Sequence, residues 1–343
     1  MSDNAPVLSG ATLHAIAWQD LPRWKDDDHL AAFQAFLETA CAQVEQRTPL
    51  RAAMPADDAF IKIASLALSL EITNQDQART FFEMYFIAYR ISPFEGRGFL
   101  TAYYEPEVEA SFEQNDLYPV PLYAKPDDLT ENYFTRAEIE DGALNGRGLE
   151  RLYLKNPVDL FFMQVQGSGK ARLPDGSKRR IQYAGRNGRP YVTIAKVLIA
   201  EGHLTLTEAH AEGVKAWLKA HPDDARRIMR LNTSYIFFDV LDDDGATGPV
   251  GGAATHLIPN RSIAIDRTIW PYGLPFYIEA ELPDGHGGVE SMARVMIAQD
   301  TGSAILGPAR ADLFMGSGGE AGKRAGLIRH RGEFTVLWPK GDR

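Results

Sequence analysis

At 343 residues, this chain is longer than a usual single domain, so we expect two domains and a sizeable core. Hydrophobic residues make up 45% of it and charged residues 24%, which is ordinary for a globular protein and excludes wholesale disorder. The formal net charge of -10 argues against a nucleic acid or an anionic membrane held by bulk electrostatics.

The first ten residues have neither the basic nor the apolar region of a signal peptide, and no run in the sequence is long and apolar enough to span a membrane. Taken alone, this predicts a cytoplasmic protein. Residues 28 to 91 follow a helical period, as in Phe33, Phe36 and Cys41 and again in Phe60 and Ile63. Helices are therefore expected to lead the chain.

From residue 98 the apolar period changes to two, which indicates strands. In the run from 161 to 166, Phe161, Met163 and Val165 would share a core-forming face. Gln164 and Gln166 would lie on the other face and offer their amides to a ligand. This pattern predicts a strand beside a binding site.

A hairpin is predicted next, because the turn sequence 173–177 precedes the strand-like run 180–184. Helices are expected at about 190–201, 206–220 and 222–231, with Pro222 in a first turn, and strands again from Tyr235. This order favours an α+β fold with barrel-like sheets over a doubly wound sheet.

A basic island on this acidic chain surrounds the predicted hairpin, and two interpretations of it stay open. It can steer a polyanionic polymer, or it can be a solvated hairpin surface. Its members are Lys170, Arg172, Lys178, Arg179, Arg180, Arg186 and Arg189.

Three aspartates mark short apolar segments in the last third of the chain. Asp300 follows the run 293–299 and precedes a glycine turn, Asp266 ends the run 262–265, and Asp312 lies in 310–316. A carboxyl group at such an edge is partly screened from water, which lets it hold a proton as a general acid must. The alternative is that these aspartates bind the backbone of their own turns.

No metal site or cofactor is predicted. Cys41 is the one cysteine of the sequence, and the eight histidines are scattered without ligand spacing.

Several long motifs resemble the membrane-bound lytic murein transglycosylase A family, in the same order along the chain. The match covers about residues 90 to 340. The motifs are Thr101–Pro106, Asp159–Gly169, Tyr183–Gly188, Arg261–Asp266, Pro271–Gly273, Ala298–Ile305 and Asp312–Gly316.

The resemblance implies a mainly β core, in which residues 10–104 and 226–340 form a double-psi β-barrel catalytic domain with N-terminal helices. Residues 105–225 would form an inserted small β domain, with a glycan cleft between the two domains.

The resemblance also implies a single catalytic carboxyl group, Asp300, which protonates the glycosidic oxygen and then accepts the proton of the attacking O6 hydroxyl of muramic acid. Asp266 and Asp312 would support it, while Glu105 is a rival carboxylate. Glycan contacts are expected at Thr101, Tyr103, Tyr104, Gln164, Gln166, Gly167, Ser168, Gly169, Tyr183 and Asn187.

Peptidoglycan glycan strands are the implied partner, together with cell-wall synthesis or division complexes. The implied location is the periplasm or cell envelope of a Gram-negative bacterium, which requires a signal peptide that this sequence does not show. Two other functions stay open: a non-catalytic, expansin-like polysaccharide-binding protein, and an inverting glycoside hydrolase with Glu105 or Asp266 as its base.

Overall fold

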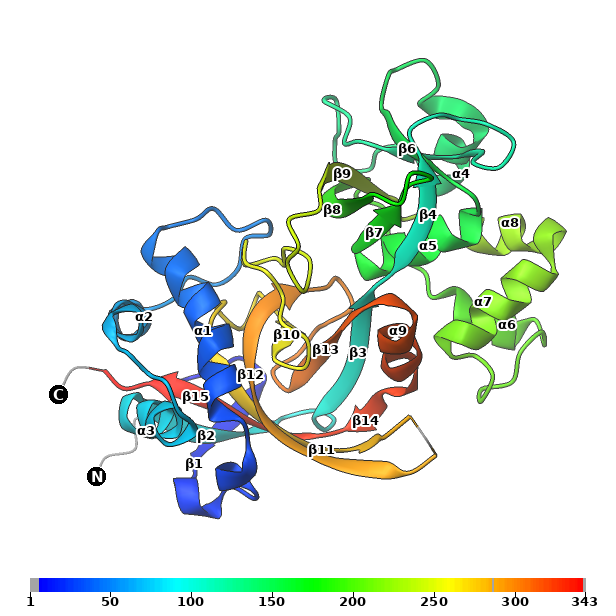
Figure 1. Ribbon diagram of the computed structural model, residues 1–343. Coiled ribbons are helices and arrows are strands. Elements are labelled where there is room, and N and C mark those ends of the chain that lie inside the picture. The colour runs from blue at the N-terminus through cyan, green and yellow to red at the C-terminus, as the bar shows by residue number, and fades with distance from the viewer. Residues whose placement is uncertain (1–5, 286, 342–343) are drawn as a thin grey trace. The chain divides into compact units, whose positions relative to one another are not determined.

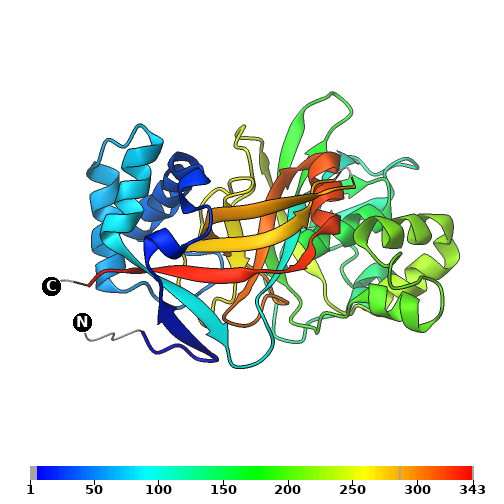
Figure 2. The same cartoon turned by 90° about the horizontal axis from the view of Figure 1, so that it is seen from below.

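The computed structural model describes residues 6–285 and 287–341. The chain divides into two compact units (Figures 1 and 2). Unit 1 comprises residues 1–103, 250–316 and 327–343, and unit 2 comprises residues 104–249 and 317–326. Each unit is therefore assembled from segments that are distant in the sequence.

Unit 1 is a sheet with a group of helices. Its helices are α1 (His29–Val44), α2 (Asp58–Ser69) and α3 (Gln75–Tyr85). Its strands are β1 (Ala11–Ala15), β2 (Phe86–Pro93), β3 (Phe99–Glu105), β10 (Ser262–Ile265), β11 (Pro275–Pro283), β12 (Val289–Thr301), β13 (Arg310–Ser317), β14 (Arg329–Arg331) and β15 (Glu333–Pro339).

The predicted N-terminal helices are confirmed as α1, α2 and α3, which lie together at one end of the long strands of the unit 1 sheet (Figure 2). Each begins at a polar cap: Asp28, Asp57 and Asn74 accept hydrogen bonds from backbone N–H groups of the first turn. The expectation of helix up to residue 91 is wrong for 86–91, because β2 pairs there with β1 and β15.

Within the described residues, the unit 1 strands follow the order β1-β2-β15-β11-β12-β10-β13-β3-β14. The pairs β11–β12 and β11–β15 are antiparallel, whereas β10 and β12 are parallel. The coarse prediction of an α+β fold dominated by sheet is confirmed. This strand order has two ends, β1 and β14, so the described residues do not form a closed barrel.

Unit 2 combines a second sheet with short helices. Its strands follow the order β5-β6-β4-β7-β8-β9. They are β4 (Glu107–Ser111), β5 (Val120–Tyr123), β6 (Glu150–Leu154), β7 (Ser168–Arg172), β8 (Lys178–Arg186) and β9 (Ile236–Asp242). Its helices are α4 (Arg136–Glu138), the π-helical turn η3 (Ile139–Ala143), α5 (Pro157–Gln166), α6 (Ile194–Ala200), α7 (Ala211–Ala220), α8 (Pro222–Arg230) and α9 (Gly318–Leu327).

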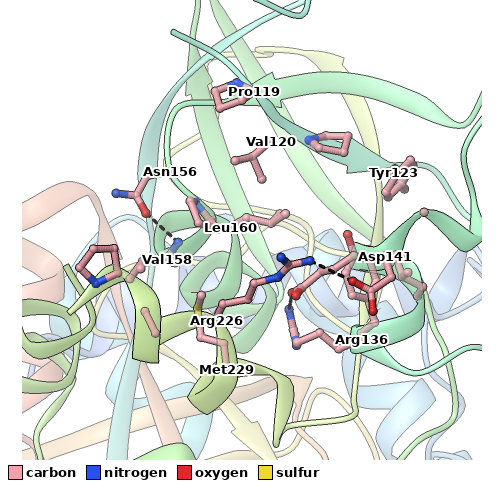
Figure 3. A pocket seen from close by; sticks show the side chains of 18 of the residues that line it. Pro119, Val120, Tyr123, Arg136, Asp141, Asn156, Val158, Leu160, Arg226 and Met229 are labelled. Carbon is pink, nitrogen blue, oxygen red and sulfur yellow. Dashed lines mark hydrogen bonds and ion pairs between the residues drawn. The ribbon is translucent and has the colours of Figure 1, made fainter. Parts of the chain in front are cut away.

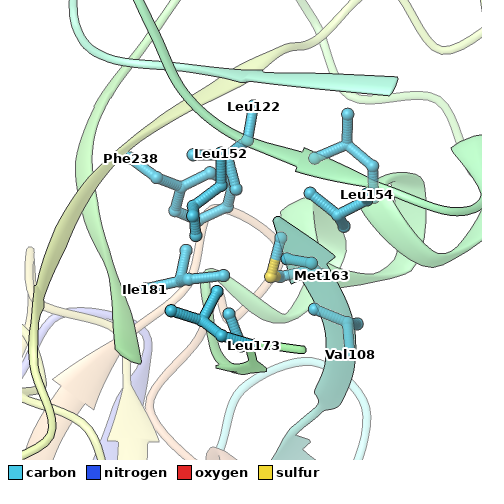
Figure 4. Packing of buried hydrophobic residues seen from close by; sticks show 11 residues of the cluster. Val108, Leu122, Leu152, Leu154, Met163, Leu173, Ile181 and Phe238 are labelled. Atoms are coloured by element: carbon cyan, nitrogen blue, oxygen red, sulfur yellow. The ribbon is translucent and has the colours of Figure 1, made fainter. Parts of the chain in front are cut away.

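The sheet of unit 2 packs on a buried apolar core that includes Leu152, Met163, Ile181 and Phe238 (Figure 4). The predicted hairpin is confirmed as β7 and β8, which pair in antiparallel fashion from Ser168 to Arg172.

The predicted strand at 161–166 is wrong, because this segment is helix α5. Asn156 caps its first turn by accepting a hydrogen bond from the Val158 N–H at 2.7 Å, and Pro157 occupies a position that needs no donor. Gly167 then ends the helix in the left-handed conformation, with φ 86°. Phe161 and Met163 are buried but Val165 is 40% exposed, so the alternation of period two does not hold.

The sequence predicted that the chain returns to the first domain at residue 226, whereas in the structure unit 1 resumes at residue 250. Strand β9 pairs with β8 from Ile236 to Asp242, and this pairing keeps residues 226–249 in unit 2. The assignment of catalysis and of a glycan cleft to particular domains stays a prediction.

The predicted basic island is largely neutralised inside unit 2. Arg180 is 1% exposed, and its guanidinium lies 3.1 Å from the Glu105 carboxylate and 2.9 Å from that of Asp244. Lys178 and Arg172 pair with carboxylates of β4. The interpretation as a free steering surface is therefore wrong for Arg180, whose charge is needed to hold buried Glu105.

Two features are absent from the described part of the chain. Across residues 6–285 and 287–341, no helix is long and apolar enough to cross a bilayer. In the same residues, His, Cys, Asp and Glu side chains form no cluster of three or more suited to a metal ion.

Removing one partner of the Arg180–Glu105 pair should destabilise the protein, because a buried charge is left uncompensated. We expect Arg180→Met to lower the free energy of unfolding by about 3–5 kcal/mol in urea titrations. Its neighbour Arg179 pairs with the exposed Asp242 at 3.5 Å, so Arg179→Met should cost less than about 1 kcal/mol. Equal effects of the two substitutions would contradict a buried ion pair.

Candidate functional site

Asp300 and Asp312 lie on one face of the unit 1 sheet because of strand register. Ala264 of β10 pairs with Asp300 of β12 on one side and with Asp312 of β13 on the other. Residues directly opposite one another point to the same face, and neighbouring strands are about 4.8 Å apart. Strand β10 lies between β12 and β13 (Figure 1). Its Ala264 is therefore the residue between the two aspartates.

A β-bulge in β12 turns Asp300 to this face. Ile263 pairs with Ala298, but the next residue of β10, Ala264, pairs with Asp300, so Gln299 is the additional residue. The Gln299 side chain is fully buried and donates hydrogen bonds to the Ala35 carbonyl and the Thr39 hydroxyl, at 3.0 and 2.8 Å. The bulge is therefore anchored to α1.

The Asp300 carboxyl group is half-buried, and its two oxygens have different partners. Oδ1 accepts hydrogen bonds from the backbone N–H groups of Gly252 and Thr301, both at 2.8 Å. Oδ2 is 2.7 Å from the Tyr103 hydroxyl, which donates to it. Since two amides occupy Oδ1, a proton carried by this group belongs on Oδ2.

Tyr103 is held in place by packing against the same face. Its ring lies 5.4 Å from that of Phe314, within a buried cluster that also contains Leu257, Ala264 and Ile305. Burial, reinforced by the charge of Asp300, raises the pKa of the Tyr103 hydroxyl well above its ordinary value. Tyr103 therefore remains a hydrogen-bond donor at neutral pH.

Asp312 is supported from β3. The Thr101 hydroxyl donates to its Oδ1 at 2.5 Å, and Arg310 Nη2 donates to the Thr101 hydroxyl at 2.8 Å. Burial raises the pKa of Asp312, an effect that the Thr101 hydrogen bond and the Arg310 charge partly offset and the Asp300 charge adds to. This carboxyl group is thus easier to protonate than an exposed one.

The Asp266 carboxylate is hydrogen-bonded to the loops around it. Oδ1 accepts from the N–H and hydroxyl of Thr268, at 3.0 and 2.6 Å, and Oδ2 accepts from the Gly307 N–H at 2.8 Å. It is 5% exposed. These contacts are those of a carboxylate that closes two loops.

Two predicted glycan contacts of unit 2, the buried Tyr104 and the partly exposed Gln166, lie next to each other. Tyr104 borders a small surface cavity, where its hydroxyl accepts a hydrogen bond from Lys215 Nζ at 2.9 Å. Gln166 accepts from the Tyr104 N–H at 3.1 Å. Gly167 caps α5, and an added Cβ at Gly169 would lie 2.5 Å from the Met163 sulfur. Gly167 is therefore needed to end the helix, and Gly169 is needed because the Met163 side chain packs against it.

Other predicted contacts lie in the interior. Asn187 has no exposed surface, and its amide binds the carbonyls of Phe134 and Thr233 and the N–H of Tyr235. Gln164 is 5% exposed and donates to the Ile236 carbonyl at 3.0 Å. The expectation that these amides face a ligand is wrong, because the backbone of unit 2 uses them. Ser168 of β7 pairs with Gln182 of β8, and Tyr183 of β8 pairs with Phe238 of β9.

Glu105 is fully buried and bound to the Ser317 hydroxyl at 2.5 Å as well as to Arg180. Burial raises its pKa, opposed by Ser317 and then by Arg180. Glu105 therefore has a structural role, in which it binds Arg180 and Ser317 inside unit 2.

Sequence analysis gave no role to three residues that surround Asp300. Gly252 supplies a backbone donor, and Tyr272 places its hydroxyl against Gly252. Arg51 donates to the Thr301 carbonyl at 3.2 Å. Tyr272 lies in the Pro271–Gly273 motif, but a role beside Asp300 depends on contacts distant in sequence.

Unit 2 contains a cavity of about 610 Å³, and none of the residues around Asp300 lines it (Figure 3). Asp141 in its wall pairs with Arg226 at 2.9 Å, while Arg136 binds the carbonyls of Asn232 and Ser234. It is therefore a separate feature from the aspartate site.

Known protein families and solved structures match this chain. Residues 99–239 match the MltA specific insert domain, and residues 261–338 match the 3D domain. A membrane-bound lytic murein transglycosylase from Agrobacterium tumefaciens, solved as a crystal structure, is 34% identical; the match covers 96% of this chain and 98% of that one, with a TM-score of 0.87. The chain belongs to the membrane-bound lytic murein transglycosylase A family.

Two other members of this family add detail. The Vibrio cholerae protein is 35% identical over 252 residues, which is 72% of this chain and 66% of that protein, just under two thirds. Escherichia coli MltA, solved with bound chitohexaose, is 25% identical over 99% of this chain and 98% of that one, with a TM-score of 0.75. The 3D domain match contains Asp266, Asp300 and Asp312, and the insert domain match contains Thr101 and Tyr103.

The raised pKa of Asp312 predicts a pH-dependent contribution to stability. The folded state binds this proton more tightly than the unfolded state, so the stability present below about pH 4 declines as the pH rises through the folded value. Asp312→Asn should remove this decline and be the more stable protein at neutral pH. Urea titrations of both proteins from pH 4 to 8 would test this; parallel curves would contradict it.

Proposed function

We propose that this protein is a lytic murein transglycosylase, which cleaves the β-1,4 bond between N-acetylmuramic acid and N-acetylglucosamine and leaves a 1,6-anhydromuramic acid end. Asp300 is the acid and then the base. The observation that carries this proposal is the asymmetric carboxyl group of Asp300, whose Oδ1 is fixed by two amides while Oδ2 meets only a phenol among its described hydrogen-bond partners.

One such carboxyl group is sufficient for this reaction. Its proton passes from Oδ2 to the glycosidic oxygen as the bond from that oxygen to C1 of muramic acid breaks. The O6 hydroxyl of the same sugar attacks C1, and its proton returns to Asp300. Because the nucleophile is part of the substrate, the reaction gains the advantage of proximity and needs no carboxylate to activate water.

The hydrolase alternative lacks a suitable second carboxylate among the candidates that the sequence suggested. Glu105 is fully buried against Arg180, and Asp266 is 5% exposed with its oxygens bound to Thr268 and Gly307. An inverting hydrolase needs a base that contacts water. The expansin-like alternative leaves the arrangement around Asp300 without a purpose, since binding needs no proton donor.

We propose a glycan of peptidoglycan as the substrate, supported by the chitohexaose bound to the Escherichia coli relative and by the names of the related proteins. The aromatic side chain of Tyr104 and the amide of Gln166 are its proposed contacts in unit 2. The cell envelope of a Gram-negative bacterium is the proposed location, with cell-wall synthesis or division complexes as further partners.

We propose in addition that the unit 1 sheet has double-psi β-barrel topology. Support comes from β10, which pairs in parallel with β12 and antiparallel with β13 although the three strands are separated in sequence.

Asp300→Asn should remove the proton donor with little change in shape. General acid catalysis contributes typically 10²–10⁴ in rate, so we expect release of soluble products from purified murein to fall by about that factor while binding to sacculi persists. Asp312→Asn, on the same sheet face, is the matched control and should lose no more than about tenfold, since it keeps an acceptor for Thr101. Lysis by Asp300→Asn at the wild-type rate would refute the assignment.

A further inference from the structure

Tyr272 carries a buried hydroxyl group without a hydrogen-bond partner in the described residues. The residue is 3% exposed, and its Oη is enclosed by protein. Leaving such a group unsatisfied destabilises the folded state, so most buried hydroxyls are hydrogen-bonded. A phenylalanine would fill the same space without this cost, which makes the hydroxyl informative.

This hydroxyl points to the Asp300 site. A Cβ atom added to Gly252 would lie 2.5 Å from Tyr272 Oη and 3.3 Å from Asp300 Oδ1. The N–H of the same glycine donates to Oδ1. The phenol and the carboxyl group therefore flank one bare backbone position, which any side chain would obstruct.

The surrounding turn fixes the Tyr272 ring without help from its hydroxyl. The N–H of Gly273 donates to the Ala298 carbonyl at 2.8 Å, and Gln43 donates to the Tyr272 carbonyl at 3.4 Å. Gly273 has φ 93°, and a Cβ there would lie 2.5 Å from the Phe60 ring. The Tyr272 hydroxyl thus lies near Asp300, and it has no hydrogen-bond partner among the described residues.

We propose that the Tyr272 hydroxyl contacts the substrate, donating a hydrogen bond to the O6 hydroxyl of the muramic acid that Asp300 deprotonates. This inference rests on the function proposed above. The hydrogen bond occupies one lone pair of O6, so the other lone pair is directed to C1 and the O6 proton to Asp300.

The chemistry balances without a proton from Tyr272. The bond between C1 and the leaving oxygen breaks and that oxygen takes the Asp300 proton; the O6–C1 bond forms and the O6 proton returns to Asp300. Tyr272 retains its hydrogen throughout. Burial, with the charge of Asp300, raises the pKa of the Tyr272 hydroxyl, so it stays a donor at neutral pH.

Tyr272→Phe separates a substrate contact from a structural role. The substitution removes no hydrogen bond within the described protein, so the thermal unfolding midpoint should be unchanged or higher. The rate of soluble product release at saturating murein should fall about tenfold to a hundredfold, as expected when one donor at a reacting centre is lost. Sedimentation with sacculi should be unchanged.

Tyr277→Phe is the matched control, because Tyr277 is equally buried in the same unit and its hydroxyl donates to the Pro22 carbonyl at 2.6 Å. This control should lower the unfolding midpoint and leave the saturated rate unchanged. The two phenylalanine variants should therefore have opposite effects. Gly252→Ala, which crowds Tyr272 Oη, should reproduce the loss of rate.

The inference is overturned if Tyr272→Phe keeps the wild-type saturated rate, or if it unfolds at lower temperature or fails to fold, because the hydroxyl would then be dispensable or structural. Asp300→Asn, assayed beside it, distinguishes the two levels. An inactive Asp300→Asn with a fully active Tyr272→Phe contradicts only the role of Tyr272. An active Asp300→Asn contradicts the proposed function itself.

Discussion

The β-bulge at Gln299 determines where the Asp300 side chain points. Consecutive residues of β10 pair with Ala298 and Asp300 of β12, and the extra residue, Gln299, is held by hydrogen bonds from its buried amide. Without the bulge, Asp300 would not face the same side as Ala264 and Asp312. The bulge also leaves the Gln299 carbonyl to accept the Ala253 N–H at 3.0 Å. That contact places Gly252, whose N–H donates to Asp300, next to β12. The bulge therefore orients the Asp300 side chain and also positions one of its hydrogen-bond donors.

The residues around Asp300 are arranged at a cost to stability. Asp312 is buried beside a second carboxyl group, and the Tyr272 hydroxyl has no bonded partner within the described structure. Other buried polar groups, such as the Asn187 amide, have several hydrogen-bond partners. Strain and unsatisfied groups concentrate where a structure serves a reaction. Asp312 and Tyr272 place two such costs beside the proposed acid.

Local signals in the sequence predicted those elements that local physics determines. The hairpin turn at 173–177 and the proline at the start of α8 each act within a few residues. The strand prediction at 161–166 failed because a short apolar run fits both periods, and the decisive signals were Asn156, Pro157 and Gly167 at its ends.

The sequence named candidate residues for the site, whereas most of their contacts could not be predicted from it. Asp300 and Tyr103 were identified, yet the hydrogen bond between them joins residues 197 positions apart and cannot be read from spacing. The same limit applies to Gly252 and Tyr272, which approach each other from separate segments of the chain. Asn187 and Gln164 were assigned to the glycan because amides suit sugars, while the structure uses them to satisfy buried backbone groups.

The origin of the oxygen atoms in the products tests the central claim most directly. Murein digested by the purified protein in water enriched in ¹⁸O should yield muropeptides that lack one water relative to hydrolysis products and contain no ¹⁸O, because O6 of the substrate closes the 1,6-anhydro ring. Products one water heavier, with ¹⁸O at C1 of muramic acid, would show that water is the nucleophile and would contradict a mechanism with a single carboxyl group.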